Sequence, residues 1–172
     1  GEVPTRFFFL EGSMFGVPFD GYHRFVVPTA TMEIRILGLF PIVEGRGAQM
    51  DRSETVTLLN DMCLLAPATL VDADIEWRVV DERRVDATFR QIKAELYFDA
   101  EGDLVDFASN DRLMSADGKT FASYRWTTPI RGYRDFGGYR LAGYGEALWA
   151  LPDGPFPYAR FDLDEVAYNL AR

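Results

Sequence analysis

Alternating apolar and polar positions run through most of this chain and predict β-strands with one buried face and one wet face. In residues 75–80, for example, Ile75, Trp77 and Val79 alternate with polar or charged neighbours. The same period of two recurs along the chain, with polar or glycine-containing turns between the runs. The predicted strands cover residues 32–37, 75–80, 85–90, 92–98, 104–114, 120–128, 131–136 and 146–151, and a long final strand covers 158–170 with a bulge near 164–165.

Asp117-Gly118 is the strongest local signal for a tight hairpin turn, because a type I′ turn needs positive φ angles. We expect it to join the strand near residues 104–114 to the strand over 120–128. The polar segment 99–103 is expected to be the tip of another hairpin. Its spaced carboxylates faintly resemble a calcium loop, but they lack the later bidentate glutamate of such loops.

Residues 51–65 break the period of two and predict the chain's one amphipathic helix. Asp51 is followed by Glu54 at the spacing of a capping box, so the helix is expected to begin at Asp51. Pro67 is expected to stop it. The predicted apolar stripe consists of Val56, Leu59 and Cys63, widened by Leu58, Met62 and Leu65.

Together these elements predict a mainly β (α+β) fold, with a strongly curved antiparallel sheet or half-barrel and one amphipathic helix packed on it. The 172 residues suit a single domain over 1–172 with a core of its own. Residues 1–4 are expected to be a flexible N-terminal remnant.

The charge of the chain narrows its partners. The net charge is −9, with 18 basic and 27 acidic residues. Nucleic acids and anionic lipid surfaces need clustered Lys and Arg, so neither is an expected partner. No apolar run approaches the ~20 residues that a membrane-spanning helix needs. Oligomeric state stays open, and so does the compartment, whether cytoplasm or cell envelope.

Candidate catalytic residues are few. His23 is the single histidine and Cys63 the single cysteine, which excludes mechanisms that need two histidines and excludes an internal disulfide. Cys63 lies on the apolar stripe, where an unreactive buried thiol is expected. Gly45-Arg46-Gly47 lacks the third glycine of a phosphate-binding loop. No metal and no cofactor is therefore expected.

Aromatic residues make up 15% of the chain, and they favour either a sheet core or the lining of an apolar cavity. The cavity interpretation predicts a non-catalytic module that binds a hydrophobic or lipid-like ligand between the curved sheet and the helix. The side chains predicted to line such a site are Trp77, Phe89, Phe98, Arg112, Arg125, Trp126, Tyr133 and Trp149.

Two other functions stay open at this level. One is an enzyme of unknown class that uses carboxylates and arginines, with Asp81, Asp86 and Arg112 as candidates. The other is a protein-interaction domain with an exposed apolar sheet face.

Several short motifs, in order and spacing, resemble a bacterial family of unknown function of the DUF6544/DUF6920 type. The resemblance runs from about Met32 to Leu170. The resemblance implies no reaction. The pattern of the family is similar to that of curved β half-barrels that carry lipid or lipoprotein in bacterial envelopes. The motifs are Met32–Gly38 with Pro41–Val43, Leu65–Leu70, Trp77 with Val80-Asp81, Val85–Thr88, Phe98–Gly102, Arg112, Trp126-Thr127, Tyr133, Trp149 and Tyr168.

Overall fold

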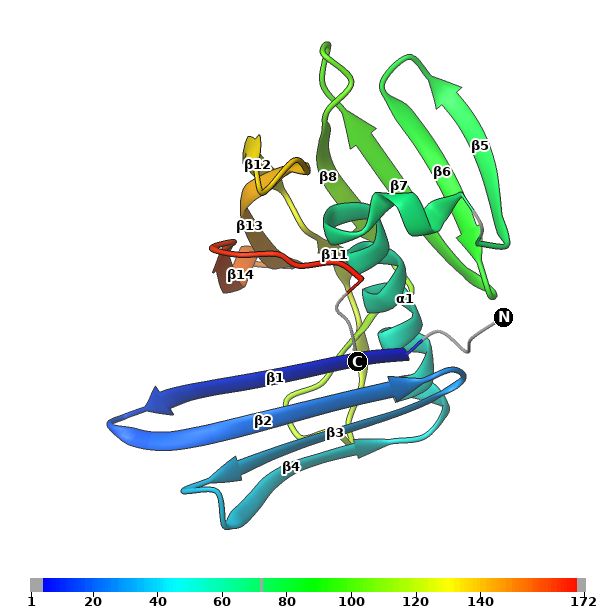
Figure 1. Cartoon of the computed structure of the whole chain (residues 1–172). Helices are drawn as coiled ribbons and strands as arrows, with labels where there is room; N and C mark the ends of the chain where they lie inside the picture. The colour runs from blue at the N-terminus through cyan, green and yellow to red at the C-terminus, as the bar shows by residue number, and fades with distance from the viewer. Residues whose placement is uncertain (1–4, 72, 170–172) are drawn as a thin grey trace. The chain divides into compact units, whose positions relative to one another are not determined.

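The computed structural model describes residues 5–71 and 73–169 and confirms a mainly β fold with antiparallel strands and one α-helix (Figure 1). The chain divides into two compact units. The first unit contains residues 1–59 and 111–124, and the second contains 60–110 and 125–172. The segment 1–4 lies outside the described residues, and the expectation of a single domain stays a prediction.

The first unit contains a four-stranded antiparallel meander. Its register pairs Phe8 with His23, and His23 with Met32, so these three side chains share one face. The strands are β1 (Thr5–Met14), β2 (Val17–Val26), β3 (Thr29–Ile36) and β4 (Phe40–Arg46), and the same unit holds the short pair β9 (Leu113–Met114) and β10 (Ala122–Ser123).

The helix α1 (Ala48–Leu65) begins three residues before the predicted start, so the capping-box prediction was wrong. The N–H of Asp51 already donates to the carbonyl of Gly47, 2.9 Å away, which closes the first helical turn. The Asp51 carboxylate instead accepts the N–H of Ala30 at 2.6 Å. Every residue from Ser53 to Asn60 is buried, so burial extends well beyond the predicted apolar stripe.

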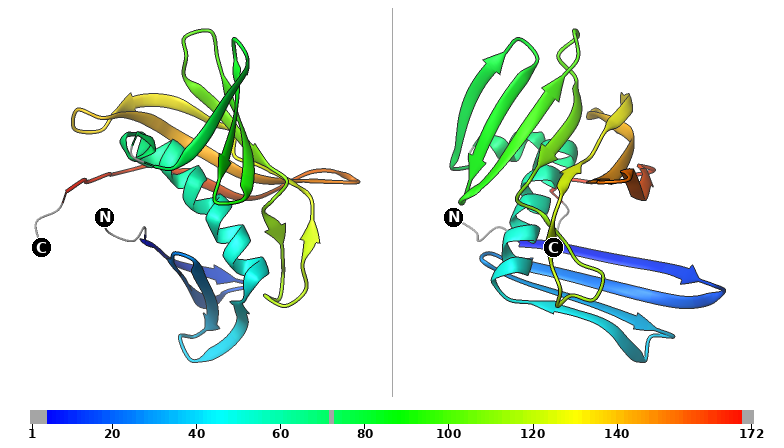
Figure 2. Two further views of the ribbon diagram at one scale, coloured as in Figure 1. Left: turned by 90° about the vertical axis from the view of Figure 1, so that its right-hand side faces the viewer. Right: turned by 180° about the vertical axis from the view of Figure 1, so that it is seen from behind.

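The second unit is built on an eight-stranded sheet, which is curved along its strand order (Figure 2). Its apolar positions alternate as predicted, and Phe107, Ile92 and Leu96 are buried in its core. Its elements are the 3-10 helix η1 (Pro67–Leu70) and the strands β5 (Ile75–Asp81), β6 (Arg84–Phe89), β7 (Ile92–Phe98), β8 (Leu104–Ser109), β11 (Arg125–Thr127), β12 (Ile130–Asp135), β13 (Arg140–Leu151) and β14 (Gly154–Asp162).

Two predicted long strands are each broken in two. The strand expected over residues 104–114 is split into β8 and β9, which belong to different units. The strand expected over 120–128 is likewise split into β10 and β11. Between β9 and β10, Gly118 has a positive φ of 72°, but the connection is a longer loop rather than a tight hairpin.

The predicted C-terminal strand was too long. β14 ends at Asp162, and residues 163–168 have no regular secondary structure. The bulge expected near 164–165 lies earlier in the strand: the register of β13 with β14 shifts between Ala147 and Leu148, which leaves Tyr158 of β14 as the extra residue. Leu170, the last residue of the prediction, falls outside the described residues.

Candidate functional site

A cluster of ionisable side chains joins β1 and β2 to α1 in the first unit. Glu54 of α1 is only 2% exposed. Its Oε2 accepts a hydrogen bond from Nη1 of Arg6 at 3.1 Å, and its Oε1 lies 3.6 Å from Nδ1 of His23. The Phe8 ring stands edge-on to the His23 ring, and the guanidinium carbon of Arg6 lies over the Phe8 ring, 5.2 Å from the ring centroid. The single histidine therefore lies beside the buried Arg6–Glu54 ion pair.

The partners of Glu54 keep it charged despite its burial. Burial alone raises the pKa of Glu54, but the pairing with His23 and the charges of Arg6 and Arg112 outweigh it, so the pKa lies below its ordinary value. Arg112 is tied to the same helix, because its Nε donates to Oγ1 of Thr57 at 3.2 Å. The predicted ligand residue Arg112 thus belongs to this polar cluster.

Beyond this cluster, the described residues on the same face of the β1–β4 sheet are apolar. Two glycines let neighbouring side chains lie flat on the sheet. An added Cβ at Gly12 would meet the Phe19 ring at 2.9 Å, and one at Gly21 would meet Leu10 at the same distance. We call this half-buried surface the apolar floor. It consists of Leu10, Phe19, Ile34, Ile36 and Val43.

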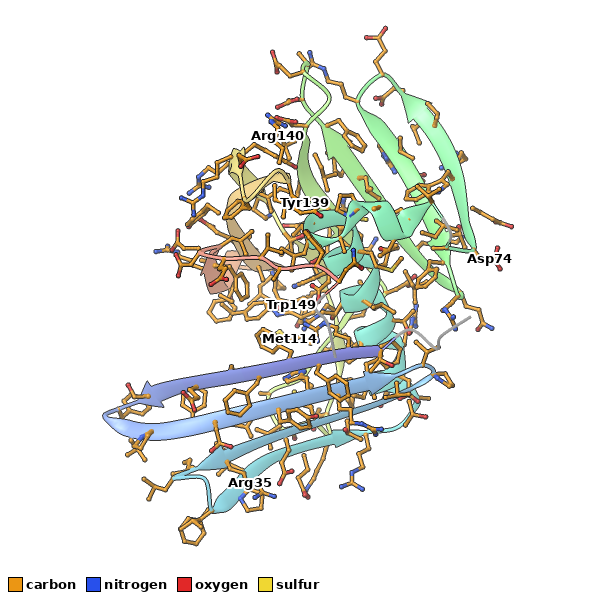
Figure 3. All side chains as sticks on the ribbon, in the orientation of Figure 1. Arg35, Asp74, Met114, Tyr139, Arg140 and Trp149 are labelled. Atoms are coloured by element: carbon orange, nitrogen blue, oxygen red, sulfur yellow. The ribbon has the colours of Figure 1, made fainter. Side chains whose placement is uncertain are left out.

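The opposite face of this sheet carries most of its charged residues, together with three exposed aromatic side chains, Phe7, Phe9 and Tyr22. Its strand positions alternate with those of the apolar floor and include Arg35, which is labelled in Figure 3 and hydrogen-bonded to Glu33 at 2.6 Å. The charged residues of this face are Glu11, Asp20, Arg24, Glu33, Arg35, Glu44 and Arg46. The floor is therefore the face without charged side chains beyond the Glu54 cluster, and the opposite face mixes charged and exposed aromatic side chains.

Two of the predicted ligand-lining residues, Trp126 and Trp149, pack on each other in the second unit. Their ring centroids are 6.5 Å apart, and Phe107 stands edge-on to Trp126 (Trp149 is labelled in Figure 3). The Nε1–H of Trp126 donates to the hydroxyl of Tyr158 at 3.0 Å. Both tryptophans are nearly fully buried, so these aromatic residues contact one another as a sheet core does.

The other predicted aromatic residues are scattered over the second unit. Phe89 is buried in β6, whereas Trp77 of β5 is 43% exposed. Tyr133 donates its hydroxyl hydrogen to the carbonyl of Leu104 at 2.9 Å. Phe98 is half-buried at the end of β7. The structure therefore spreads these four residues over separate strands and gives them different degrees of exposure.

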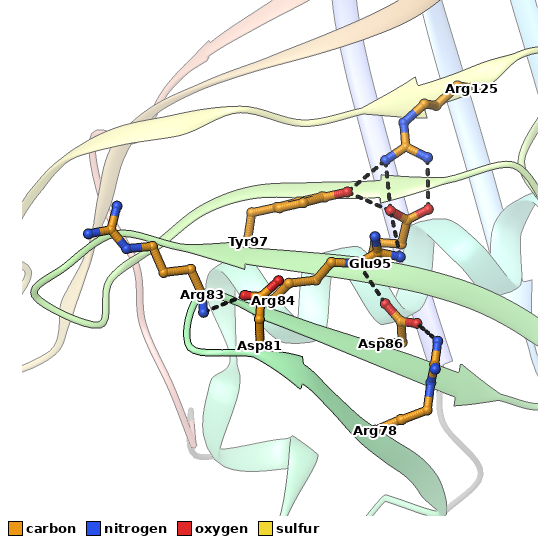
Figure 4. Close-up of polar contacts among 8 residues, drawn as sticks. All are labelled: Arg78, Asp81, Arg83, Arg84, Asp86, Glu95, Tyr97 and Arg125. Atoms are coloured by element: carbon orange, nitrogen blue, oxygen red, sulfur yellow. Dashed lines mark hydrogen bonds and ion pairs between the residues drawn. The ribbon is translucent and has the colours of Figure 1, made fainter.

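Arg125, also a predicted ligand residue, is held in a ladder of charges across β6, β7 and β11 (Figure 4). Its two terminal nitrogens donate to the two Glu95 oxygens at 2.8 and 3.0 Å. The hydroxyl of Tyr97 donates to the same carboxylate at 2.5 Å. The hydrogen bonds from Arg125 hold the pKa of Glu95 down at about 2, against the opposing effect of burial.

The carboxylates considered for an enzyme have local structural partners. Asp86 pairs with Arg78 and with Arg84, whose Nε lies 2.9 Å from Oδ1 (Figure 4). Asp81 accepts the N–H of Arg83 at 2.8 Å within the β5–β6 turn. These contacts account for both carboxylates as parts of the sheet and its turn.

Asp106 of β8 carries a buried carboxylate oxygen, Oδ1, without a hydrogen-bond partner. Burial raises the pKa of Asp106 to about 6, although the N–H groups of Phe107 and Thr128 and the charge of Arg125 act in the opposite direction. The folded state therefore favours the protonated acid. The cost of ionising this group grows as the pH rises from its ordinary pKa towards 6 and is constant above that.

Asp106→Asn is consequently expected to stabilise the protein at about pH 7.5 by about 1–2 kcal/mol, reduced from the full shift because the group is partly exposed. At about pH 2.5 the two proteins should unfold at the same denaturant concentration, because Asp106 is then largely uncharged in both states. Urea unfolding at the two pH values checks this. Equal stability of both proteins at the higher pH would contradict the inferred burial cost.

Cys63 is a free, buried thiol of the second unit, and burial raises its pKa to about 12. It is therefore protonated at neutral pH and unreactive, as the sequence predicted. Among residues 5–71 and 73–169, no three His, Cys, Asp or Glu side chains gather closely enough to hold a metal ion. The helices in the same residues are too short or too polar to cross a membrane.

The fold and these clusters define a mainly antiparallel β protein with a buried ion pair beside an apolar sheet face. The model of a family of unknown function, DUF6544, matches residues 1–161, and the chain belongs to that family. This confirms the resemblance seen in the motifs. Neither the curated proteins nor the solved structures contain a match to this chain.

Proposed function

We propose that this protein is a non-catalytic module that binds a hydrophobic or lipid-like ligand on the apolar floor of the β1–β4 sheet. The observation that carries the proposal is the floor itself, an apolar surface that stays half-exposed beside a buried ion pair. A contiguous apolar surface that remains in contact with water is one of the features by which small binding sites are recognised. The proposed ligand therefore lies on the β1–β4 sheet beside α1, whereas the aromatic residues predicted to bind it belong to the sheet of the second unit.

The shape of the floor favours a thin, elongated ligand. The side chains of Phe19 and Leu10 lie flat over Gly12 and Gly21, which keeps the surface smooth and shallow. Four strands at about 4.8 Å spacing make the floor roughly 14 Å wide, and about four residues of strand make it roughly 13 Å long. An acyl chain or a similar hydrocarbon fits such a surface by apolar contact alone.

The size of the floor argues against a protein partner as its main occupant. Its dimensions give an area of roughly 200 Å², whereas a stable protein–protein interface buries about 800 Å² on each partner. The enzyme alternative gains little from the charges, since Asp86 pairs with arginines and Asp81 belongs to a turn. A small apolar ligand is the occupant that this surface suits best.

Binding of cis-parinaric acid, a fluorescent fatty acid, tests the proposal. Ile34→Asp puts a charge in the middle of the floor and is expected to weaken binding by at least about tenfold. The matched control is Glu33→Gln on the same strand but on the opposite face, which should bind as the wild type does. Circular dichroism shows whether both variants keep the fold.

A second measurement needs no variant. If the floor holds an acyl chain, the affinity of the wild type for unlabelled fatty acids should rise by roughly threefold to fourfold with each added methylene, until the chain fills the floor. Absence of any binding, or affinity that does not change with chain length, would overturn the proposal.

A further inference from the structure

Both hairpin turns at one end of the β1–β4 sheet expose large apolar side chains. Phe15, at the apex of the β1–β2 turn, is 99% exposed. Leu39 in the β3–β4 turn and Phe40 at the start of β4 are 71% and 61% exposed. We call these two turns the hairpin tips. Their exposed apolar residues are Phe15, Val17, Leu37, Leu39, Phe40 and Ile42.

The two hairpin tips lie at the same end of the sheet. The N–H of Leu37 in one tip donates to the carbonyl of Pro18 beside the other at 2.9 Å. The ribbon views show the β1–β2 and β3–β4 turns together at the end of the sheet away from α1 (Figures 1 and 2). Phe19 and Ile36 of the apolar floor are paired next to these turns, so the floor continues up to the hairpin tips.

The backbone of each tip makes its apolar residue unexpected there. Phe15 has a φ of 54° and Leu37 a φ of 56°, each followed by a glycine with positive φ. Asn, Asp or Gly adopt this left-handed conformation at the lowest cost, and bulky side chains adopt it rarely. Both turns therefore hold a large apolar side chain outward in a strained position, which is typical of a functional site.

The charged residues nearest the tips limit how deeply the tips can enter an apolar phase. Residues 14–19 and 36–43 contain no charged side chain. Glu11 and Asp20 follow on the first hairpin, and Arg35 and Glu44 on the second. At about 3.3 Å per residue, the distance from Phe15 back to Glu11 is about 13 Å. Proteins that dock on a bilayer bury apolar side chains to about 5–10 Å. The Asp20 carboxylate lies nearest the tips, with Oδ1 3.7 Å from an added Cβ at Gly38, so it limits insertion to the outermost side chains of the tips.

We infer that the hairpin tips insert into the surface of a lipid bilayer and that the apolar floor receives its ligand from that bilayer. This inference rests on the proposed function for the source of the ligand, whereas the docking step stands on the tips alone. Leu39 donates its N–H to the carbonyl of Ile36 at 3.1 Å, and Pro18 and Pro41 have no N–H, so these three positions have no backbone donor to desolvate on insertion.

The charges near the tips define the kind of bilayer. Three of the four nearest charged residues are acidic, and the whole chain carries −9. Insertion is therefore driven by apolar contact rather than by attraction to anionic lipid. Zwitterionic phosphatidylcholine should bind at least as well as a mixture that contains phosphatidylserine, and added salt should not release the protein.

Flotation with phosphatidylcholine vesicles tests the docking step. The wild type is expected to float with the vesicles. The double variant Phe15→Ser/Leu39→Ser should lose at least about tenfold in partitioning, because two large apolar side chains are removed. The matched control, Val71→Ser/Val79→Ser, removes two apolar residues that are 84% and 76% exposed in the second unit, and it should float like the wild type.

The outcomes separate this inference from the proposed function. If the wild type does not float, or if the tip variant floats equally well, docking through the tips is overturned, whatever the result with parinaric acid. If the tip variant loses flotation but still binds parinaric acid, docking is supported and the floor is a separate site, as inferred. If the wild type floats but binds no fatty acid, the docking stands and the proposed function fails.

Discussion

Glu54→Ala is expected to lower the free energy of unfolding by about 3–5 kcal/mol, because it removes the buried carboxylate that pairs with the Arg6 guanidinium. Glu54 is 2% exposed and lies 3.1 Å from Arg6, so water cannot readily take the place of the carboxylate. Denaturant unfolding followed by circular dichroism at about pH 7 measures the loss. Glu11→Ala, at an exposed carboxylate of the same sheet, should change stability by less than about 0.5 kcal/mol.

The pH dependence of this effect has a definite sign. The pKa of Glu54 lies below its ordinary value of 4.5 in the folded state, so its stabilisation is complete above that value. It is lost as the pH falls through the lower folded pKa. The gap between the wild type and Glu54→Ala should therefore narrow in acid. A gap that stays constant down to about pH 2 would mean that the carboxylate charge contributes nothing.

A double variant distinguishes the ion pair from simple packing. Replacing Arg6 and Glu54 together by methionine removes both charges and keeps much of the volume. This change is expected to cost less than Glu54→Ala alone, because the Arg6 guanidinium is removed together with its carboxylate partner. A double variant as unstable as the single one would show that the site requires a polar network for another reason.

Phe107→Ala is expected to destabilise the second unit by about 3–5 kcal/mol, because it opens a cavity in a closed core. Phe107 is 0% exposed in the middle of β8 and stands 6.2 Å from Trp126, edge to face. The chain's three tryptophans all belong to the second unit, so their fluorescence reports its unfolding. The expected result is a lower denaturant midpoint and a changed Trp126 emission.

Phe161→Ala serves as the control for this variant. Phe161 lies on β14 of the same unit and is 49% exposed, so its loss should cost less than about 1 kcal/mol. Comparable losses for the two variants would mean that Phe107 is not the packing centre that its burial indicates.

The strands were predictable because alternation depends only on which face of a sheet is wet. The runs 75–80, 85–90 and 92–98 correspond closely to β5, β6 and β7. The helix start was missed because Asp51 and Glu54 have partners remote in sequence, Ala30 and Arg6. A local capping pattern cannot reveal that a carboxylate is already engaged by another strand.

The candidate site was predicted less well than the fold. Aromatic content drew attention to Trp126 and Trp149, which pack on each other, and a sequence does not show which aromatic residues meet. The hairpin tips carried a readable signal, the uncharged runs 14–19 and 36–43 with a glycine in each. It was missed because turns are normally polar, so apolar runs there were not interpreted as turns.

The first unit is discontinuous in sequence, and this affects the order in which the protein can be made. Its last segment, residues 111–124, contributes the hydrogen bond from the N–H of Leu113 to Oγ of Ser53, 3.0 Å long, and the bond from Arg112 to Thr57. During synthesis the N-terminal hairpins leave the ribosome first, but their unit is completed only after Tyr124 has emerged. Until then, the nascent chain presents its apolar floor and hairpin tips on a sheet that still lacks these two hydrogen bonds.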